Sequence, residues 1–332
     1  MEQLTGYVGI DVSKDTLDVF CLKEKTAKEV KGVSETFSND AKGFSKLLRW
    51  CQFKLSDRQL HFGMESTGNY SRAIAEFLVE NNQFISMLNP ARVKAFASSL
   101  GVGNKTDPVD ARTIALFCHA TQPVLWRMAE SEIQELTALV RHLQNLQTNL
   151  LQINNRLGDP GLVSSVQSSL KKTQAFLLSE IKLIEEQINR HIDNTPSLKG
   201  DKELLRSIPG IGEKLAHSIL AELPSVEQFE NAKAVAAYAG LAPRQFRSGS
   251  SVNRKTRISK TGNSNLRKAL YMPALSAKTH NPFVRDMYNR LVERGTAKKA
   301  ALIAAMRKLL MIAYGVLKSR TPFTIMPCNA SA

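Results

Sequence analysis

The first 120 residues alternate short apolar runs with amphipathic stretches, a pattern that predicts strands and helices in turn. Apolar runs predict strands at residues 7–12, 17–22, about 36–37, 60–64 and 84–88. Helical spacing of apolar residues predicts helices at 41–51 and 71–80. Strands that come first in hairpins and then in β-α-β order predict one mixed sheet with helices on its faces.

Residues 130–194 have a different pattern, with apolar residues three and four positions apart along two long stretches. The first stretch runs to Leu157, and the Gly-Asp-Pro-Gly sequence at 158–161 must end its helix. The second stretch runs to about Asn194. This spacing predicts a coiled-coil pair of helices. The pair either folds back as an antiparallel hairpin or is shared between subunits, and the sequence leaves both possibilities open.

A third pattern begins at Lys202, where two apolar helical segments flank the sequence Ile-Pro-Gly-Ile-Gly at 208–212. This arrangement resembles the helix-hairpin-helix motif, in which glycines let backbone amides approach a DNA phosphate at a helix N-terminus. We therefore take Gly210, Gly212 and Lys214 as candidate DNA contacts. The alternative is a tight corner between two helices that serves packing alone.

The positive charge of the chain is concentrated in its C-terminal quarter. Lys and Arg number 45 against 30 Asp and Glu in the whole chain, but residues 244–320 hold 18 of the bases and only two of the acids. Such a block is typical of a surface that binds phosphate backbones. A solvated basic face and an anionic membrane surface are the alternatives. The candidate contacts are Arg244, Arg247, Arg254, Lys255, Arg257, Lys260, Arg267 and Lys268.

Composition excludes several classes of protein. With 43% hydrophobic and 23% charged residues, the chain is globular rather than disordered or fibrous. We find no apolar run of the length that a membrane helix needs and no signal-peptide pattern, so we expect a cytoplasmic protein without a membrane partner. The cysteines are far apart in sequence, which disfavours disulfides and cysteine-rich zinc sites. They are Cys21, Cys51, Cys118 and Cys328.

Two pairs of acidic residues in the first 120 positions are candidates for a metal site. Asp11 ends the first predicted strand, and Glu65 directly follows the fourth. Asp107 and Asp110 are three residues apart at a predicted helix start, where Pro108 suits the first turn, so both lie on one helical face. Clustered carboxylates repel one another unless divalent cations bind them. Two such cations could stabilise the attacking and leaving oxygens of a phosphoryl displacement. A helix cap, a turn residue and a surface charge are the alternatives.

The sequence RSGSS at 247–251 is a small loop with basic flanks. A serine hydroxyl there could approach a DNA phosphate whose charge the neighbouring arginines neutralise. On the residues alone, a glycine-serine linker between helices is the simpler interpretation.

Short segments along nearly the whole chain resemble one family, the transposases of bacterial insertion sequences of the IS110 group, which are relatives of the Piv DNA invertases. The segments occur in the family's order: GIDVSK, MESTGNY, NPARVKAFA, NKTDPVDA, SIPGIGEK, AGLAPR, SGSSVNRKTRISKTGN and LRKALYMPA. The resemblance implies an RNase H-like domain of the RuvC type, whose metal-binding acids correspond to Asp11, Glu65, Asp107 and Asp110 and hold Mg²⁺. It also implies a nucleophilic serine, Ser248, with Ser250 and Ser251 as the alternatives.

The mechanism and the partners are likewise implied by the resemblance. The serine attacks the DNA backbone, forms a phosphoserine linkage and leaves a free 3′ hydroxyl, and strand exchange passes through a Holliday junction. A structured guide RNA from the element's non-coding end pairs with target and donor DNA. Acids and serine come from different subunits of a homodimer or homotetramer, in a bacterial, nucleoid-associated protein.

These patterns divide the chain into four predicted parts. They are a RuvC-like domain at 1–125, coiled-coil helices at 126–197, a mainly α-helical serine transposase domain with the helix-hairpin-helix at 198–320, and a tail at 321–332. Two other functions stay open: a hydrolytic Holliday-junction nuclease that uses only the acids, and a non-enzymatic nucleic-acid binder. The first hairpin also resembles the phosphate-binding hairpin of actin-like sugar kinases. Their Gly-rich nucleotide loops and their second domain are not found in the sequence.

Overall fold

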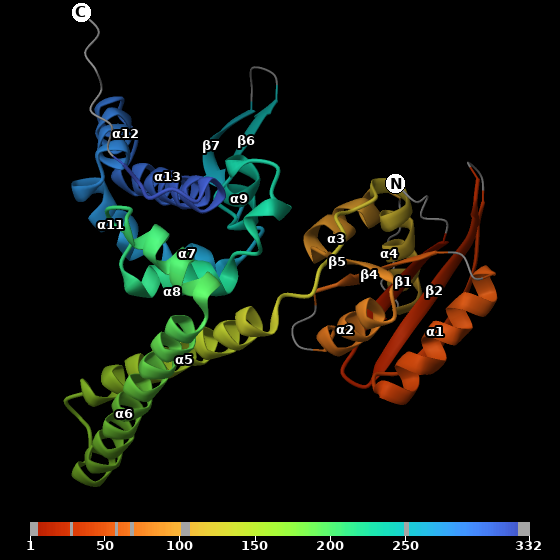
Figure 1. Ribbon diagram of the computed structural model, residues 1–332, viewed down its shortest axis with the longest axis horizontal. Helices are drawn as coiled ribbons and strands as arrows, with labels where there is room; N and C mark the ends of the chain where they lie inside the picture. Colours follow the sequence, from red (N-terminus) through yellow and green to blue (C-terminus); the bar gives the residue numbers. More distant parts are fainter. Residues whose placement is uncertain are drawn as a thin grey trace, which may run out of the picture. The chain divides into compact units, whose positions relative to one another are not determined.

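An apolar mixed sheet forms the centre of the first of two compact units, Met1–Met128 and Ala129–Ala332, into which the chain divides (Figure 1). The computed structural model describes residues 6–26, 29–56, 59–66, 70–100, 107–248 and 252–324, without the side chains of 107–109, 245–248 and 252–256. Both predicted C-terminal segments, 126–197 and 198–320, fall almost entirely in the second unit. The domain boundaries stay predictions.

Within the described residues, five strands of the first unit form a sheet in the order β3-β2-β1-β4-β5. Strands β1, β2 and β3 are antiparallel neighbours, whereas β4 and β5 follow β1 in parallel. The strands are β1 (Gly6–Val12), β2 (Thr16–Lys25), β3 (Val30–Ser38), β4 (Leu60–Glu65) and β5 (Phe84–Leu88). The predicted mixed α/β sheet is confirmed.

Helices cover both faces of this sheet, because its strands are apolar on both sides. Val8 and Ile10 of β1 are fully buried among the apolar side chains of α1 and α2, and Tyr7 and Leu22 point to the opposite face, with α4. Figure 1 shows α1 and α2 on one side of the strands and α3 and α4 on the other. The helices are α1 (Ala41–Leu55), α2 (Arg72–Glu80), α3 (Pro90–Ser99) and α4 (Asp107–Thr121).

The sequence pattern predicts no helix directly after the strand at 84–88, but the structure has α3 there. In the structure, Asn89 Oδ1 accepts a hydrogen bond from the Ala91 amide and Pro90 occupies the first turn. The same two residues therefore end β5 and begin α3.

The predicted helical pair is an antiparallel hairpin within one chain, formed by α5 (Ser131–Leu157) and α6 (Ser164–Asn194). Leu136 and Val140 of α5 and Ile184 and Ile188 of α6 are buried in one apolar cluster. The Gly-Asp-Pro-Gly sequence forms the turn between them, as the sequence predicts.

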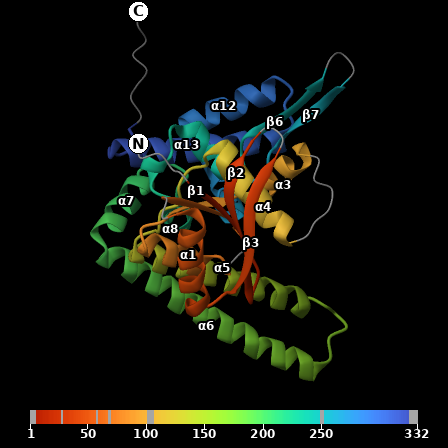
Figure 2. The same ribbon diagram turned by 90° about the vertical axis from the view of Figure 1, so that its right-hand side faces the viewer.

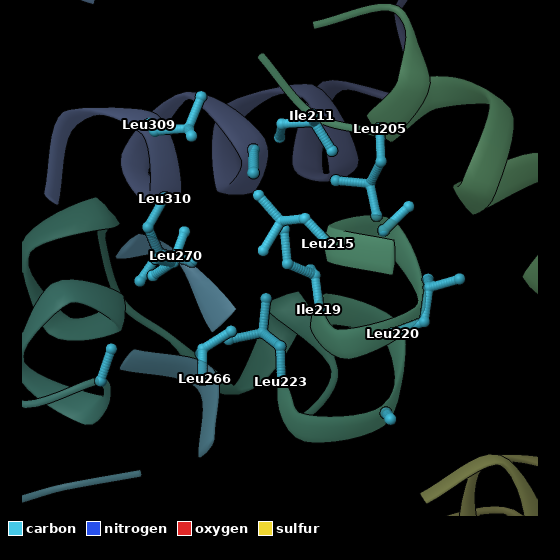
Figure 3. Packing of buried hydrophobic residues seen from close by; sticks show 14 of the residues in the cluster. Leu205, Ile211, Leu215, Ile219, Leu220, Leu223, Leu266, Leu270, Leu309 and Leu310 are labelled. Atoms are coloured by element: carbon cyan, nitrogen blue, oxygen red, sulfur yellow. The ribbon is translucent and has the colours of Figure 1, made fainter. Parts of the chain in front are cut away.

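The rest of the second unit is mostly helical and packs around α13, and Figure 3 shows the leucines and isoleucines at its centre. Its helices are α7 (Pro196–Arg206), α8 (Glu213–Glu222), the short 3-10 helix η1 (Val226–Gln228), α9 (Ala232–Tyr238), α10 (Ser264–Ala269), α11 (Tyr271–His280), α12 (Pro282–Glu293) and α13 (Lys298–Ser319). Of the described helices, α13 alone is long and apolar enough to cross a membrane, which corrects the expectation that no such run exists. However, 56% of its apolar stretch is buried inside the unit, as befits a core helix.

Two features near the C-terminus are not predicted by the sequence pattern. The serine-containing segment is a β-hairpin of β6 (Pro243–Ser248) and β7 (Val252–Ile258), not a linker between helices, and it projects from the helices in both views (Figures 1 and 2). The start of the tail is anchored, because the Phe323 amide donates to Ser207 Oγ at 2.8 Å and its ring contacts Phe283.

Candidate active site and nucleic-acid interface

The backbone places Asp11 and Glu65 side by side at the carboxyl ends of two parallel strands. Ile10 of β1 pairs with Met64 of β4, and each acid is the next residue along its strand. Neighbouring strands lie about 4.8 Å apart. Both acids are half-buried, and the register of the strands puts them at the same end of the sheet.

Helix α4 covers the face of the sheet on which these acids stand. A methyl group at Gly9 would lie 2.0 Å from the Ala111 carbonyl oxygen, and one at Gly63 would lie 2.3 Å from Cys118 Sγ of α4. Because side chains alternate along a strand, Asp11 and Glu65 share the face of these glycines.

The direction of α4 brings its first turn to the same end of the sheet. The Tyr7 ring contacts His119 with centroids 5.1 Å apart, whereas Gly9, two residues further along β1, lies against Ala111. The helix therefore runs antiparallel to β1. From Gly9 to Asp11 the strand advances about 6.6 Å, and from Ala111 back to Asp107 the helix advances about 6 Å. The end of β1 is therefore level with the first turn of α4. That turn contains Asp107 and Asp110.

The structure thus brings the backbones of the four predicted acids to one end of the sheet. Among the residues whose side chains are described, no group of three or more His, Cys, Asp or Glu could hold a metal ion. Asp110 is half-buried, and the side chain of Asp107 lies outside the described residues.

A fifth carboxylate, Asp18, escaped the sequence reasoning. It lies on β2 directly opposite Asp11 and accepts a hydrogen bond from Thr36 Oγ1 at 2.6 Å. Its neighbours Leu17 and Val19 point into the core under α1, so Asp18 shares the α4 face with Asp11. The alternation of apolar residues in TLDVFCL predicts that Asp18 lies on the opposite face of the strand from Leu17 and Val19. Only the register of the β1–β2 hairpin places it beside Asp11.

The predicted nucleophile Ser248 is the last residue of β6, where it lies opposite Val252. The alternatives Ser250 and Ser251 lie outside the described residues. So do the side chains of Ser248 itself and of Arg247, Arg254 and Lys255.

Basic residues face one another across this hairpin. Arg244 pairs with Arg257, Phe246 pairs with Arg254, and a bulge lies between the two pairs. Counting along β6, the positions of Arg244, Phe246 and Ser248 share one face of the ribbon. Directly opposed like charges destabilise a strand pair, and a phosphate backbone relieves that repulsion by neutralising them. Arg257 is exposed and available for such a contact.

The basic residues that follow the hairpin differ in their surroundings. Lys260 and Lys268 are exposed. Arg267 is half-buried, and its Nη1 donates to the Ala239 carbonyl oxygen at 3.0 Å. The Arg267 guanidinium therefore holds the chain just before β6, whatever else it binds.

The Ile-Pro-Gly-Ile-Gly segment forms the turn between α7 and α8. Gly210 has a φ of 98°, and a methyl group there would lie 2.5 Å from Ala277 Cβ, so packing against α11 already requires this glycine. Gly212 has open space around it, immediately before α8. Lys214 forms a 3.0 Å ion pair with Glu185 of α6. Phosphate binding by this turn stays a prediction.

Two family models match the sequence over these regions. The model described as the transposase IS116/IS110/IS902 family matches residues 202–289, which include Ser248. A model described as a transposase, of the DEDD type of IS110, matches residues 8–159, which include the four acids.

Curated relatives extend the similarity to nearly the full length. The pilin gene-inverting proteins of Moraxella bovis and Moraxella lacunata are each 33% identical over 319 residues, which is 96% of this chain and 97% of theirs. The transposase for insertion sequence element IS1111A of Coxiella burnetii is 25% identical over 259 residues, with 68% of this chain and 69% of its own covered.

Proposed function

The chain belongs to the IS116/IS110/IS902 family of transposases and is a DNA recombinase, and from this premise we propose that it mobilises its own insertion sequence with a serine nucleophile and a metal-binding acid site. The observation that carries the acid site is the meeting of α4 with the carboxyl ends of β1 and β4. Residues distant in sequence, Asp11, Glu65 and Asp110, reach one end of an RNase H-like sheet through it.

The four acids fit a divalent cation such as Mg²⁺, because hard cations prefer carboxylate oxygens. DEDD-type transposase domains are typically metal-dependent. When bound, the cation would polarise a phosphate and stabilise the charge of its displacement. Asp11 and Glu65 would hold it from the strands, and Asp107 and Asp110 from the helix.

The serine step exchanges one phosphoester for another. The Ser248 Oγ bonds to phosphorus, the bond from phosphorus to the 3′ oxygen breaks, and the proton that serine loses is balanced by the proton that the 3′ oxygen gains. The products are phosphoserine and a free 3′ hydroxyl, so the energy of the phosphodiester is kept for rejoining. Arg244 and Arg257 neutralise the phosphate during this exchange.

Nucleic-acid binding rests on the basic C-terminal quarter, where residues 244–320 hold 18 Lys and Arg against two acids. Such a surface binds backbones without regard to sequence. Delegating sequence choice to a guide RNA would suit it. The protein works on the DNA of the bacterial nucleoid, as a homodimer or homotetramer with acids and serine from different subunits.

Mixing two inactive variants tests the composite site. Asp11→Ala lacks an acid and Ser248→Ala lacks the nucleophile. Mixed oligomers regain activity if one subunit supplies the acids and another the serine. If the mixture stays as inactive as each variant alone, acids and serine act within one chain.

DNA inversion is a second candidate function, favoured by the pilin gene-inverting relatives that match over 96% of this chain. It uses the same chemistry on a segment that stays in place. A plasmid that carries the gene with its native flanking non-coding DNA distinguishes the two, since excision or insertion gives other junctions than inversion.

The experiment that tests the chemistry maps the covalent adduct. Protein that has reacted on this plasmid is purified under denaturing conditions and analysed by mass spectrometry. We expect a DNA adduct on Ser248, its loss in Ser248→Ala, and the loss of cleavage but not of DNA binding in Asp11→Ala. An adduct on Ser250 or Ser251 would move the nucleophile. Recombinant products without any serine adduct would favour the hydrolytic nuclease.

A further inference from the structure

A buried carboxylate, Glu222, lies at the last position of α8 and outside the site described above. Its side chain is 1% exposed. Among the described residues, four donor groups reach its two oxygens. Arg141 Nε and Asn265 Nδ2 donate to Oε1 at 2.8 and 3.0 Å, and Arg141 Nη2 and Asn263 Nδ2 donate to Oε2 at 3.0 and 2.7 Å.

These donors come from two different parts of the second unit. Arg141 belongs to α5 of the helical hairpin, whereas Asn263 and Asn265 stand at the start of α10, directly after the serine hairpin. Burial by itself raises the pKa of Glu222, but the hydrogen bonds from Arg141 and the two asparagines outweigh it and hold that pKa below its usual value. The charged form of Glu222 is thus favoured in the fold, and removing one of these partners would leave a buried charge less well compensated.

Asn263 extends the cluster to the base of the serine hairpin. Its amide donates to the Tyr238 carbonyl oxygen at 2.7 Å, and its Oδ1 caps α10. Tyr238 Oη in turn donates to the Glu222 carbonyl oxygen at 3.1 Å. Asn263 thus ties the segment after β7 to the segment before β6.

Two backbone hydrogen bonds complete this base. The Ser259 amide donates to the Ala242 carbonyl oxygen at 2.9 Å, and the Lys260 amide donates to the Gly240 carbonyl oxygen at 3.2 Å. Gly262, with a φ of 146°, lets the two segments approach closely, because a methyl group there would lie 2.2 Å from the Tyr238 carbonyl oxygen. Both ends of the hairpin therefore leave from one fixed frame.

We propose that Glu222 is a positioning residue for the recombination reaction. By holding Arg141, Asn263 and Asn265 together, it fixes the base of the β6–β7 hairpin, and with it the strand that carries Ser248, against helix α5. The inference rests on the proposed role of Ser248 as nucleophile, whereas the fixing of the hairpin base can be measured without that role.

The test compares variants that differ in this cluster alone. Glu222→Gln keeps the shape of the side chain but loses its charge and turns an amide group toward donors. The double variant Glu222→Gln with Asn263→Asp places a carboxylate opposite the new amide group and keeps a capping oxygen at 263, while Arg141 Nη2 loses its acceptor. Lys202→Met is the matched control, because it breaks the ion pair of buried Lys202 with Asp193 in the same unit, away from the hairpin.

The first measurement is amide hydrogen exchange by mass spectrometry on the unbound protein. We expect at least tenfold faster exchange at Ser259, Lys260 and Asn263 in Glu222→Gln, partial recovery in the double variant and no change in Lys202→Met. Unchanged exchange in Glu222→Gln, or equal acceleration in Lys202→Met, would overturn the proposal. If Glu222→Gln does not fold, Asn265→Ala removes one donor and leaves the α10 cap intact, and the same exchange pattern decides.

The second measurement is the rate of serine–DNA adduct formation at saturating plasmid. We expect Glu222→Gln to slow adduct formation at least tenfold and to change the DNA affinity less than threefold. We also expect adducts on serines other than Ser248, because a misplaced strand presents other serines to the phosphate. A wild-type rate with the adduct still confined to Ser248 would refute the positioning role. Wild-type protein that recombines without a serine adduct would instead refute the proposed nucleophile, and the exchange pattern would still decide the role of Glu222.

Discussion

Gly9 controls how closely α4 approaches the sheet, so replacing it tests whether that contact builds the acid site. In Gly9→Ala the new methyl group would lie 2.0 Å from the Ala111 carbonyl oxygen and 2.6 Å from the Ala115 nitrogen. Both are backbone atoms, and no change of side-chain rotamer relieves the clash. Since carbon atoms need at least 3.0 Å here, the helix must move away by about 1 Å.

That displacement has two separable costs. Overpacking a core of this kind costs about 1–3 kcal/mol of unfolding free energy. A displacement of about 1 Å at a reacting group costs about 100-fold in rate, and Asp107 and Asp110 are carried by the first turn of α4. We therefore expect Gly9→Ala to fold, to bind DNA and to recombine about 100-fold more slowly.

Urea unfolding followed by tryptophan fluorescence measures the first cost, because both tryptophans, Trp50 and Trp126, lie in the first unit. Recombination of the plasmid measures the second. Gly200→Ala is the control, since Gly200 lies in an exposed turn of α7 in the second unit, where a methyl group meets nothing within 4 Å. Both the urea midpoint of the first unit and the recombination rate should stay at their wild-type values. Activity of Gly9→Ala within threefold of wild type, at unchanged stability, would refute the role of α4 in the site.

Three further predictions concern titration, reactivity and salt. Burial lowers the pKa of His61 to about 4, so the fold favours the neutral ring. The first unit should therefore lose about 3 kcal/mol of unfolding free energy as pH falls from 6.5 to 4, measured by urea unfolding with tryptophan fluorescence. This loss should be smaller in His61→Gln, and equal pH slopes in the variant and the wild type would contradict the prediction. Burial raises the pKa of the Cys118 thiol to about 12. Iodoacetamide at pH 8 should therefore leave Cys118 unmodified until urea unfolds the protein, as it should the buried Cys21 and Cys51. Mass spectrometry of the labelled peptides measures this. Arg257→Ala should lower the slope of log Kd against log salt by about 0.9 if the arginine binds one phosphate, and an unchanged slope in filter binding would remove Arg257 from the interface.

The sequence predicted the sheet unit well because its signals are local. The strand at 60–64 and the helix at 41–51 are each predicted by the spacing of their own apolar residues. The structure extends them only to Glu65 and Leu55. The hairpin β6–β7 has no such signal. Its strands, PRQFRS and VNRKTRI, have charged residues at positions where a strand packed against a core has apolar ones. The apolar pattern therefore favours a linker over a hairpin.

Candidate site residues divide in the same way. Asp11 and Glu65 could be predicted because an acid at the end of an apolar strand is visible in the sequence itself. Asp18 could not, since its place beside Asp11 depends on the pairing of β1 with β2. Gly210 has a structural role that the sequence does not reveal: besides its place in a pattern that resembles a DNA-binding motif, its contact with Ala277 already requires a glycine.

Glu222 marks the limit of sequence reasoning on this chain most clearly. In the segment HSILAEL the sequence predicts a polar residue at the end of an amphipathic helix, and a charged residue in that position is not expected to be buried. Its partners are 81 residues away on one side, at Arg141, and 41 on the other, at Asn263. Because a buried carboxylate is tolerated only where such partners converge, the need for Glu222 exists only in the folded unit. A residue of this kind can position a nucleophile without carrying any motif, which is why the structure and not the sequence assigns it.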